Sequence, residues 1–370
     1  MSKILILANH YNTLRIFRRE LLQELYKQGH DVIVSMPESD ADNKNQIESY
    51  GCKVIFTPVE RRGMNPVKDL KLLFDYIQLL RKEKPDKVIT YTIKPNIYGS
   101  LACKTRHIPH YANVTGLGSA FQAQGGIMRK WVSFLYKISL NKATKVFFEN
   151  EGNKDTLVCD GIIRKEQAVV MPGAGVNLDE FYKCDYCSTQ QETNFLFIGR
   201  IMREKGVDEL FETIKRVKKL YSNIKFTFIG WYEDSYQSIV EQLEEQGMIE
   251  FHGFQLEVRP FIEKAHCVIL PSWHEGMSNT LLEAAAMCRP LITTNIHGCK
   301  EAVIDGHTGY LVELRDAESL FEKICEFIEL SYEEKKQMGQ AGRKHMIDVF
   351  DKYEVVKRTM KEMMLDVNVG

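Results

Sequence analysis

Short apolar runs alternate with longer helical patterns along nearly the whole chain, and this alternation constrains the fold more than any other feature. In the first half, runs rich in Val and Ile occur at residues 3–8, 31–35, 53–57, 87–91, 111–114 and 145–148. Patterns with helical periodicity lie between them, at residues 14–27, 67–84, 97–106 and 127–141. The apolar runs show little alternation of polar and apolar residues, as expected of strands buried on both faces. Such strands alternating with helices predict a parallel, doubly wound sheet.

The same pattern restarts after residue 193. Strand-like runs follow at residues 194–198, 225–229, 249–251, 266–270, 291–294 and 310–312. Helical patterns follow at residues 207–221, 234–246, 257–264, 279–287 and 317–328. We therefore predict an α/β chain with two Rossmann-like, doubly wound parallel-sheet domains facing a cleft, at residues 1–171 and 172–349. Residues 350–370 predict an amphipathic helix that either caps the second domain or crosses back to the first, and the sequence leaves both open.

Length and composition fit this picture and exclude several classes of protein. A chain of 370 residues, 44% hydrophobic and 27% charged, is typical of a soluble protein with two domains. A formal charge of −1 gives no general attraction to nucleic acid. No apolar run approaches the roughly 20 residues that cross a bilayer, and the first residues predict a strand, not a signal peptide.

The nine cysteines indicate a reducing, cytoplasmic location, because no secretory signal accompanies them. Cys184 and Cys187 form a lone Cys-x-x-Cys pair. A structural zinc site would need a second pair of ligands at suitable spacing, and none lies nearby. We therefore interpret both as free thiols and expect no metal site.

Two carboxylates mark residues 271–290, PSWHEGMSNTLLEAAAMCRP. Glu275 lies in the loop after a predicted strand, and Glu283 lies about one turn inside the next predicted helix. Open α/β sheets bind ligands where a strand ends and a helix begins. The amides of Met277, Ser278 and Asn279 would suit an anion, and the carboxylates would suit sugar hydroxyls. The stretch therefore predicts the donor half of a sugar-nucleotide site.

A second candidate stretch, GRIMREKG at residues 199–206, follows the first strand of the second half. Arg200 can bind phosphate oxygens with its planar fork, and Lys205 adds a point charge. Taken alone, a solvated basic loop is an equally good interpretation. The diphosphate interpretation gains from the Glu275 stretch, because both would lie at the carboxyl edge of one sheet.

These motifs resemble those of family 4 glycosyltransferases, which have the GT-B fold. HEGMSNTLLEA has the family's Glu-x7-Glu spacing, and GRIMREKG resembles its Gly-Arg…Lys-Gly phosphate loop. PGAGVNLDEF resembles the entry into the second domain, and IHGCKEAVIDGHTGYLV resembles the segment after the glutamate pair. In the first half, TGLGSAF and Arg18 after Asn12 resemble the bacterial branch that builds capsule, O-antigen or lipid-linked glycans.

The resemblance implies a donor site and a reaction. Arg200 and Lys205 would bind the donor diphosphate and stabilise the leaving group, Glu275 would contact the sugar, and Glu283 would bind the ribose. Further donor contacts would come from Gly199, His252, Phe254, Gly276, Met277, Ser278 and Asn279. The implied enzyme transfers a hexose or N-acetylhexosamine from a nucleoside-diphosphate sugar, by expectation UDP-linked, to a saccharide on polyprenyl diphosphate. It would retain anomeric configuration, with a donor phosphate oxygen as base, and need no metal or other cofactor.

The acceptor side is less well marked. The resemblance implies Asn12, Arg18, Thr115 and Gly116 as acceptor contacts. The first loop, residues 8–12, lacks the glycine pair common in the family, and VTGLG stands where many members have a histidine. His10 is interpreted either as a cleft residue or as a structural one, and the structural role is favoured.

Residues 127–142, IMRKWVSFLYKISLNK, combine four cations with aromatic and aliphatic side chains. One interpretation is a helix that packs on the core while its lysine ends reach water. The other is a helix that lies on an anionic membrane surface. The second would make the protein peripheral on the inner face of the cell membrane, where a lipid-linked acceptor would be found.

Other functions remain as alternatives. A UDP-sugar epimerase of GT-B fold would need no acceptor, and a phosphorylase would ordinarily need a pyridoxal phosphate lysine and much more chain. A dinucleotide-dependent oxidoreductase is disfavoured, because no Gly-x-Gly-x-x-Gly follows the first strand of either half. An inactive glycosyltransferase-like scaffold would be expected to lose the charged motif residues, which are all present here.

Overall fold

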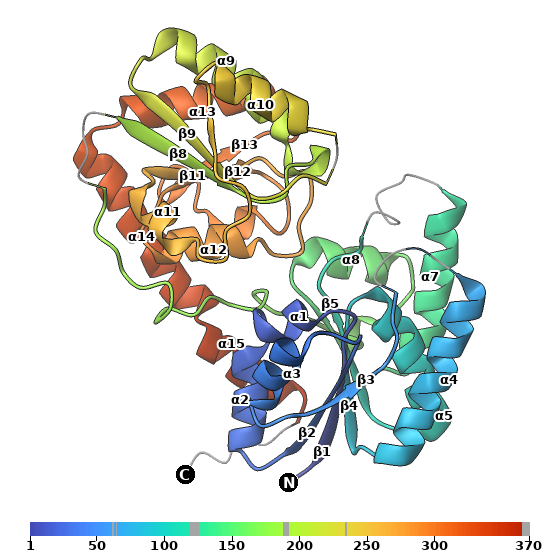
Figure 1. The fold of residues 1–370 in the computed structure, drawn as a ribbon. Helices are drawn as coiled ribbons and strands as arrows, with labels where there is room; N and C mark the ends of the chain where they lie inside the picture. The colour runs from blue at the N-terminus through green and yellow to red at the C-terminus, as the bar shows by residue number, and fades with distance from the viewer. Residues whose placement is uncertain (61–62, 64, 119–125, 188–191, 234, 365–370) are drawn as a thin grey trace. The chain divides into compact units, whose positions relative to one another are not determined.

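A computed structural model describes residues 1–60, 63, 65–118, 126–187, 192–233 and 235–364. The chain forms two compact units, each built around its own parallel sheet (Figure 1). Unit 1 comprises Met1–Ala174 and Tyr353–Gly370, and unit 2 comprises Gly175–Lys352. The chain therefore leaves unit 1 once and returns to it.

The sheet of unit 1 has seven strands in the order β3-β2-β1-β4-β5-β6-β7. The strands are β1 (Lys3–Leu7), β2 (Asp31–Met36), β3 (Lys53–Phe56), β4 (Lys87–Tyr91), β5 (His110–Val114), β6 (Lys145–Phe148) and β7 (Ala168–Val170). The helices are α1 (Tyr11–Arg15), α2 (Arg19–Lys27), α3 (Ala41–Glu48), α4 (Pro66–Glu83), the π-helix η1 (Pro95–Gly99), α5 (Ser100–Arg106), α7 (Ile127–Leu140), α8 (Glu151–Cys159), η2 (Lys165–Gln167) and α15 (Lys352–Glu362). The strand order reverses between β1 and β4, which is where such sheets bind ligands.

One face of this sheet is covered by α4, α5 and α7, on the right in Figure 1. The core under α4 contains Leu5 and Val88, and the core under α7 contains Ala112 and Val146. The strand register pairs Leu5 with Val88 and Ala112 with Val146, and Thr90, two residues after Val88, pairs with Ala112. Paired residues, and residues two apart on a strand, share a face. α4 and α7 therefore cover the same face.

The opposite face is covered in part by α15, which comes from beyond unit 2. Its apolar side chains Val355, Val356 and Met360 are buried in the same core as those of β1 and α2, together with Met363 just after the helix. The hydroxyl of Tyr111 donates a hydrogen bond to the carbonyl of Met363 at 2.8 Å. The sequence left open whether the C-terminal helix packs on the first or the second domain, and in this structure it packs on unit 1.

The sheet of unit 2 has six strands in the order β10-β9-β8-β11-β12-β13. The strands are β8 (Thr193–Ile198), β9 (Ile224–Ile229), β10 (Glu250–Phe251), β11 (Cys267–Leu270), β12 (Leu291–Thr294) and β13 (Gly309–Val312). The helices are η3 (Arg203–Lys205), α9 (Val207–Leu220), α10 (Gln237–Glu245), α11 (Arg259–Lys264), α12 (Asn279–Ala286), η4 (Lys300–Ala302), α13 (Ala317–Glu329) and α14 (Tyr332–Phe350). Here the order reverses between β8 and β11, so the loops after these two strands meet.

One departure from the predicted elements of unit 1 lies at residues 14–27. The sequence predicts one helix there, whereas the structure has α1 and α2 with a break at residues 16–18. Arg18 has φ −129° and ψ 10°, which is not helical. Nδ1 of His10 accepts a hydrogen bond from the amide of Asn12 at 3.1 Å, so His10 caps α1 and has a structural role. Among the described residues, no helix combines the length and apolar character needed to cross a membrane.

Candidate active site

The loops after β8 and β11 bring two predicted catalytic residues into contact. Nζ of Lys205 forms an ion pair with Oε1 of Glu275, although the two lie 70 residues apart in sequence. The hydroxyl of Ser272 donates to the same carboxylate oxygen at 2.9 Å. The amide of Trp273 donates to the carbonyl of Glu204 at 2.9 Å, which joins the two loops through their backbones.

Two glycines make this close approach possible. Gly206 has φ +71°, and a Cβ atom there would lie 2.0 Å from the carbonyl oxygen of Pro271. Gly298 has φ +91°, and a Cβ atom there would lie 2.6 Å from the carbonyl oxygen of Glu275. No side chain fits at such distances, so both positions require glycine. The glycines of the phosphate-loop motif and of the IHGCKEAVIDG segment thus hold the Glu275 loop in place.

The amides at the start of α12 differ from the expectation. The amide of Ser278 donates to the carbonyl of Gly298 at 2.9 Å, so it is not exposed to an anion in this structure. Met277 and Ser278 are both buried, and Asn279 is the first residue of α12. The prediction of exposed amides is therefore wrong for Ser278, because the loop packs against Gly298. Gly276 lies in the same loop, next to Glu275.

Arg200 pairs with a carboxylate that the motifs did not point to. Its Nη1 lies 2.7 Å from Oε2 of Glu233. Glu233 follows β9, the neighbour of β8, so both residues lie at the carboxyl edge of the sheet. The only sequence signal for Glu233 is its position a few residues after a predicted strand. The two predicted phosphate-binding cations each hold a carboxylate.

Glu283 lies on α12 and is half-buried. Burial raises the pKa of its carboxyl to about 7, and nearby Glu180 acts in the same direction while Lys352 opposes it. Removing a carboxylate from water disfavours its charged form. Glu283 can therefore exchange a proton close to neutral pH.

Three glycines line the carboxyl edge of the sheet beside the cation loops. A Cβ atom on Gly230 would lie 1.7 Å from the carbonyl oxygen of Gly199, and the amide of Gly230 donates to the carbonyl of Gly253 at 2.9 Å. His252 and Phe254 flank Gly253 after β10, so β9 lies between them and the strand that carries Arg200. The structure thus brings these predicted donor residues to the same edge of the sheet.

Phe254 is exposed, and its ring meets that of Trp231 edge-on with centroids 5.4 Å apart. Nε2 of His252 lies 3.4 Å from a carboxylate oxygen of Glu250. His274, next to Glu275, has its pKa lowered by burial, against the raising effect of Glu275. A neutral imidazole at that position is consistent with a bracing role in the loop.

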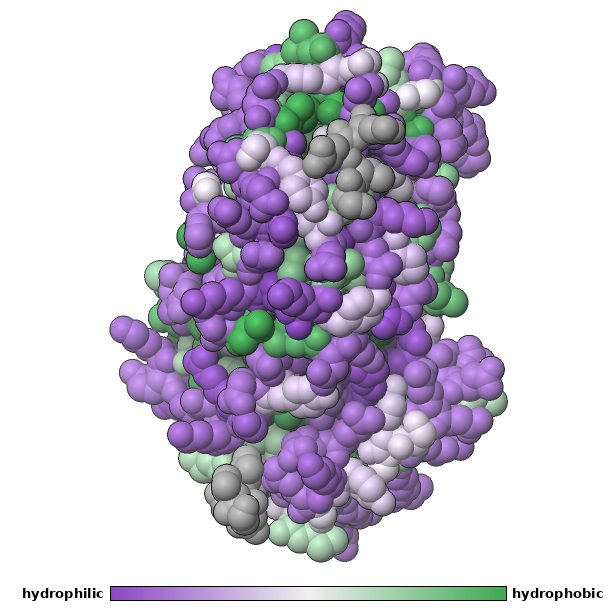
Figure 2. All heavy atoms as spheres, turned by 90° about the vertical axis from the view of Figure 1, so that its left-hand side faces the viewer, coloured by the Kyte–Doolittle hydropathy of each residue, from purple (hydrophilic) through white to green (hydrophobic). Residues whose placement is uncertain are grey.

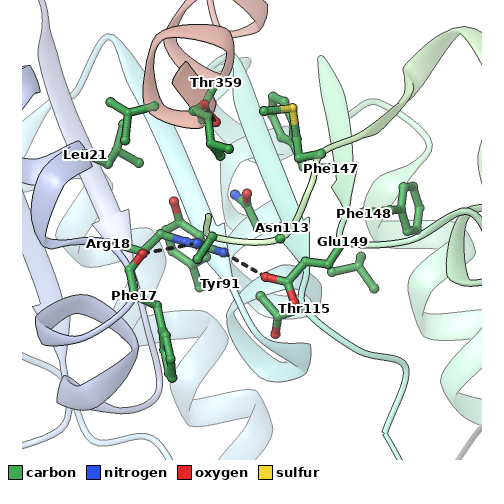
Figure 3. A pocket seen from close by; sticks show the side chains of 16 residues that line it. Phe17, Arg18, Leu21, Tyr91, Asn113, Thr115, Phe147, Phe148, Glu149 and Thr359 are labelled. Atoms are coloured by element: carbon green, nitrogen blue, oxygen red, sulfur yellow. Dashed lines mark hydrogen bonds and ion pairs between the residues drawn. The ribbon is translucent and has the colours of Figure 1, made fainter. Parts of the chain in front are cut away.

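A pocket in unit 1 lies at the carboxyl ends of β4, β5 and β6 (Figure 3). Arg18 extends across it, and its Nη2 lies 3.0 Å from Oε1 of Glu149. The guanidinium carbon lies 5.0 Å from the centre of the Tyr91 ring. Asn113 and Thr115 also line the pocket, and other lining residues include Phe17, Leu21, Phe147, Phe148 and Thr359.

Only some of the predicted acceptor residues line this pocket. Arg18 and Thr115 do, whereas Asn12 and Gly116 are not among its lining residues. The side-chain oxygen of Asn12 accepts a hydrogen bond from Nε of Arg15 at 3.4 Å within α1. Residues 119–121 of the TGLGSAF motif lie outside the described part of the chain. Glu149, the ion-pair partner of Arg18, carries no motif and was not predicted.

Comparisons with known families cover most of the chain. Residues 186–345 match the sequence model of the family described as "Glycosyl transferases group 1". Residues 3–150 match that of the family described as "Glycosyl transferase 4-like". The chain is a glycosyltransferase. The resemblance to family 4 is thereby confirmed in both halves.

The glycosyltransferase has similar bacterial relatives. It is 26% identical to an enzyme of Campylobacter jejuni, over 85% of this chain and 86% of the relative, named N,N'-diacetylbacillosaminyl-diphospho-undecaprenol alpha-1,3-N-acetylgalactosaminyltransferase. It is 26% identical to the capsular polysaccharide biosynthesis glycosyltransferase CapM of Staphylococcus aureus, over 82% and 83%. It is 23% identical to the UDP-Gal:alpha-D-GlcNAc-diphosphoundecaprenol alpha-1,3-galactosyltransferase of Escherichia coli, over 86% and 85%.

Solved structures support the fold of the glycosyltransferase. HepE of Anabaena, in complex with UDP and glucose, matches with a TM-score of 0.79 at 15% identity, over 98% of this chain and 100% of that one. A glycosyltransferase of Rickettsia africae matches with a TM-score of 0.76 at 19% identity, over 100% and 99%. The fold is GT-B, as the resemblance to family 4 implies.

The cysteine pair of the glycosyltransferase has structural neighbours. Sγ of Cys184 accepts a hydrogen bond from Nη2 of Arg289 at 3.2 Å, and both Cys184 and Cys187 are partly buried. Arg289 is fully buried and also donates to the carbonyl of Asp185 at 3.0 Å. Among the described residues, no group of three or more His, Cys, Asp or Glu could hold a metal ion.

Proposed function

We propose that the protein transfers a hexose or N-acetylhexosamine from a UDP-sugar to a saccharide on polyprenyl diphosphate in bacterial surface polysaccharide synthesis. The observation that carries the proposal is the meeting of Lys205 and Glu275 beside Arg200, at the reversal point of the second sheet. Two relatives support the acceptor class, since their names contain a diphospho-undecaprenol or diphosphoundecaprenol acceptor. The UDP donor is supported by the name of the second of these and by the UDP complex of HepE.

In this proposal, Arg200 and Lys205 bind the donor diphosphate. Negative charge grows on the diphosphate as its bond to the sugar breaks, so fixed cations stabilise the transition state more than the ground state. Glu275 accepts hydrogen bonds from the sugar and stabilises positive charge at the anomeric carbon. Glu283 accepts hydrogen bonds from the ribose hydroxyls.

The proposed step retains anomeric configuration. The acceptor hydroxyl oxygen forms a bond to the anomeric carbon from the face that the diphosphate leaves. The bond between that carbon and the diphosphate oxygen breaks, and the hydroxyl proton passes to an oxygen of the departing diphosphate. The anomeric configuration of the product, measured by NMR, tests this step, because an inverted product would contradict it.

The reaction in this proposal needs no metal, because Arg200 and Lys205 balance the charge of the diphosphate. Transfer is expected to continue at an unchanged rate in the presence of EDTA. A loss of activity that Mg²⁺ or Mn²⁺ restores would contradict this part of the proposal.

The acceptor saccharide is proposed to bind at the unit 1 pocket that Arg18 and Thr115 line. The guanidinium of Arg18 and the hydroxyl of Thr115 can donate hydrogen bonds to sugar oxygens. The carboxylate of Glu149 can accept them. The cytoplasmic side of the membrane is the proposed location, because nucleotide sugars and the lipid-linked acceptor meet there.

Lys205→Ala and Glu275→Ala test the assigned roles. Each is expected to lower kcat/KM by about 100-fold or more, since each removes a charge aimed at the transition state. The matched controls, Lys219→Ala and Glu212→Ala, replace exposed residues of α9 and should leave activity unchanged. Near-normal activity in both test variants, with unchanged unfolding temperatures, would refute the proposed site.

Donor preference is measured by thermal shift with UDP-, GDP- and ADP-sugars. A donor at 100 times its Kd stabilises the fold by about 2.7 kcal/mol. Stabilisation by GDP- or ADP-sugars alone would contradict the UDP assignment. Product analysis with donor alone separates the two alternatives, because an epimerase converts the sugar without acceptor and an inactive scaffold yields no product in any mixture.

A further inference from the structure

The solvent side of α4 carries an apolar stripe with no described partner in the structure. Val67, Leu70 and Phe74 are between 57% and 79% exposed. Their spacing of three and four residues aligns them on one side of the helix. Leu72 and Tyr76 are buried on the other side, against the sheet. α4 is therefore apolar on both its inner and its outer side.

α7 has the same character. Met128, Trp131 and Phe134 are between 49% and 52% exposed, and the rings of Trp131 and Phe134 stack with centroids 5.9 Å apart. Val132 and Tyr136 are buried in the core below. Some aromatic side chains of this helix are therefore buried in the core, whereas others are exposed.

The outer sides of α4 and α7 point away from the same face of the first sheet, because both helices cover that face with their inner sides. Figure 1 shows both helices in this layer, on the right of the sheet. Figure 2 shows the side of the molecule that lies at the left in Figure 1, and hydrophilic residues dominate it, with hydrophobic ones in scattered small patches. Exposed apolar stripes such as those of α4 and α7 therefore do not extend over the whole surface of the protein.

Cations accompany the apolar stripes on both helices. On α4, Lys71, Arg81 and Lys82 are exposed, and each lies within about 60° of Val67 around the helix axis. The acidic Asp69 and Glu83 point inward and pair with Lys94 at 2.8 Å and Lys53 at 3.0 Å, and Asp75 is half-buried.

On α7, Lys130 and Lys137 are exposed, and the sequence of the helix contains no acidic residue. Arg129 is half-buried and lies 3.1 Å from Asp160, so its charge is largely matched within the protein. The outer side of α7 therefore combines aromatic rings with two lysines, for which the described part of the chain shows no ion pair.

We propose that the outer sides of α4 and α7 form one membrane-docking surface that binds an anionic lipid bilayer. Apolar side chains enter the interface between headgroups and acyl chains, while lysine and arginine meet the anionic headgroups. A second copy of the chain fits less well, because a two-fold interface would bring the cations of both copies together. The inference deepens the proposed function and rests on it, because the lipid-linked acceptor of that function lies in such a bilayer.

Vesicle sedimentation tests the surface without donor or acceptor. The full chain is mixed with vesicles of phosphatidylcholine alone, or with about one third phosphatidylglycerol, at low and high salt. Binding is expected only to the anionic vesicles and is expected to weaken with salt. Leu70→Ser with Phe74→Ser on α4, or Trp131→Ser with Phe134→Ser on α7, should each lower the affinity at least tenfold. Lys71→Gln with Lys130→Gln should lower the affinity for anionic vesicles and reduce its salt dependence.

The matched control is Leu220→Ser, which replaces an exposed leucine of unit 2 and should bind as the native chain does. All substituted residues are exposed, and unfolding temperatures verify that the variants fold. No sedimentation of the native chain with anionic vesicles would overturn the proposal. If the α4 variant binds vesicles with native affinity, α4 is not part of the docking surface. If the native chain is a dimer that these substitutions dissociate, the surface binds a second copy of the chain and not a bilayer.

Transfer assays separate this inference from the proposed function. The surface variants should keep native activity on a water-soluble acceptor analogue and lose at least tenfold on an acceptor embedded in anionic vesicles. If no acceptor supports transfer while vesicle binding persists, the function fails and the surface stands. If transfer occurs equally in both settings for all variants, the surface fails and the function stands.

Discussion

Arg200 and Lys205 each pair with a carboxylate of their own unit, Glu233 and Glu275. A donor diphosphate would compete with these carboxylates for the same cations. The two pairs differ in their proposed roles, since Glu275 is proposed to contact the sugar, whereas Glu233 has no assigned role toward the donor. We therefore expect Glu233 to limit how strongly Arg200 binds a phosphate.

Glu233→Gln is expected to tighten donor binding. The amide keeps the size of the side chain but removes the charge that competes with phosphate. Partly exposed ion pairs contribute up to about 1 kcal/mol, so Kd for a UDP-sugar should fall by up to about fivefold. Titration calorimetry measures this, with the exposed Glu245→Gln as the control. Weaker binding would show that Glu233 orients Arg200 instead of competing for it.

Glu283 should make donor binding depend on pH. Its pKa is raised to about 7, so the carboxyl is protonated below that pH and ionised above it. An ionised carboxylate is the stronger acceptor for ribose hydroxyls. Kd for a UDP-sugar should therefore fall several-fold as pH rises from about 6 to 8, because the diphosphate diester itself does not titrate there. Glu283→Gln should abolish this slope, and a slope that persists in the variant would assign it to another group.

Among the elements, buried strands were the most predictable from sequence. Within the predicted run 266–270, residues 267–270 are all apolar, without alternation, because helices cover both faces of the sheet. α14 was not predicted, and its glycines explain why. Gly339 resembles a helix breaker, yet a Cβ atom there would lie 2.1 Å from the carbonyl oxygen of Cys288, so close helix packing requires it. α3 and α8 were missed because each buries one residue, Ile47 or Leu157, which leaves no periodic signal.

The sequence predicts those parts of the site that lie in motif-bearing loops directly after strands. The Arg200 loop and the Glu275 loop carry motifs, and the parallel topology brings them together. Glu233 and Glu149 also follow strands, but no motif marks them, and only the order of the strands makes them neighbours of Arg200 and Arg18. The hydrogen bond from Ser278 to Gly298 depends on loop packing that the sequence does not encode locally.

Gly206, at which the Arg200 loop contacts the Glu275 loop, should tolerate no side chain. Gly206→Ala adds a Cβ atom 2.0 Å from the carbonyl oxygen of Pro271, so the loops must separate. We expect a loss of more than about 2 kcal/mol in stability, together with loss of transfer activity. Gly247→Ala is the control, since it has a similar positive φ of +65° in open space and should cost about 1 kcal/mol. Equal losses in urea unfolding would show that strain in φ, and not the contact, is responsible.

At the scale of the whole molecule, α15 makes the core of unit 1 depend on residues beyond unit 2. Met360 is fully buried in that core, and Met364 is largely exposed. Met360→Ala should destabilise unit 1 by about 2–5 kcal/mol, and Met364→Ala should have little effect. Of the three tryptophans, only Trp131 belongs to unit 1, so its fluorescence in a chain with Trp231→Phe and Trp273→Phe reports on that unit. Equal midpoints of urea unfolding for both methionine variants would contradict the packing described.

The return of the chain to unit 1 has a consequence for its folding during synthesis on the ribosome. Residues 1–174 are synthesised first, but the hydrophobic surface that α15 covers stays open until residues 353–363 have left the exit tunnel. All of unit 2 is made in the meantime, and synthesis proceeds at about 5–20 residues per second, so that surface is exposed for roughly 10–40 seconds. The unit translated earlier is therefore the one that completes its fold later, and a nascent chain stalled before residue 352 should be captured by chaperones through unit 1.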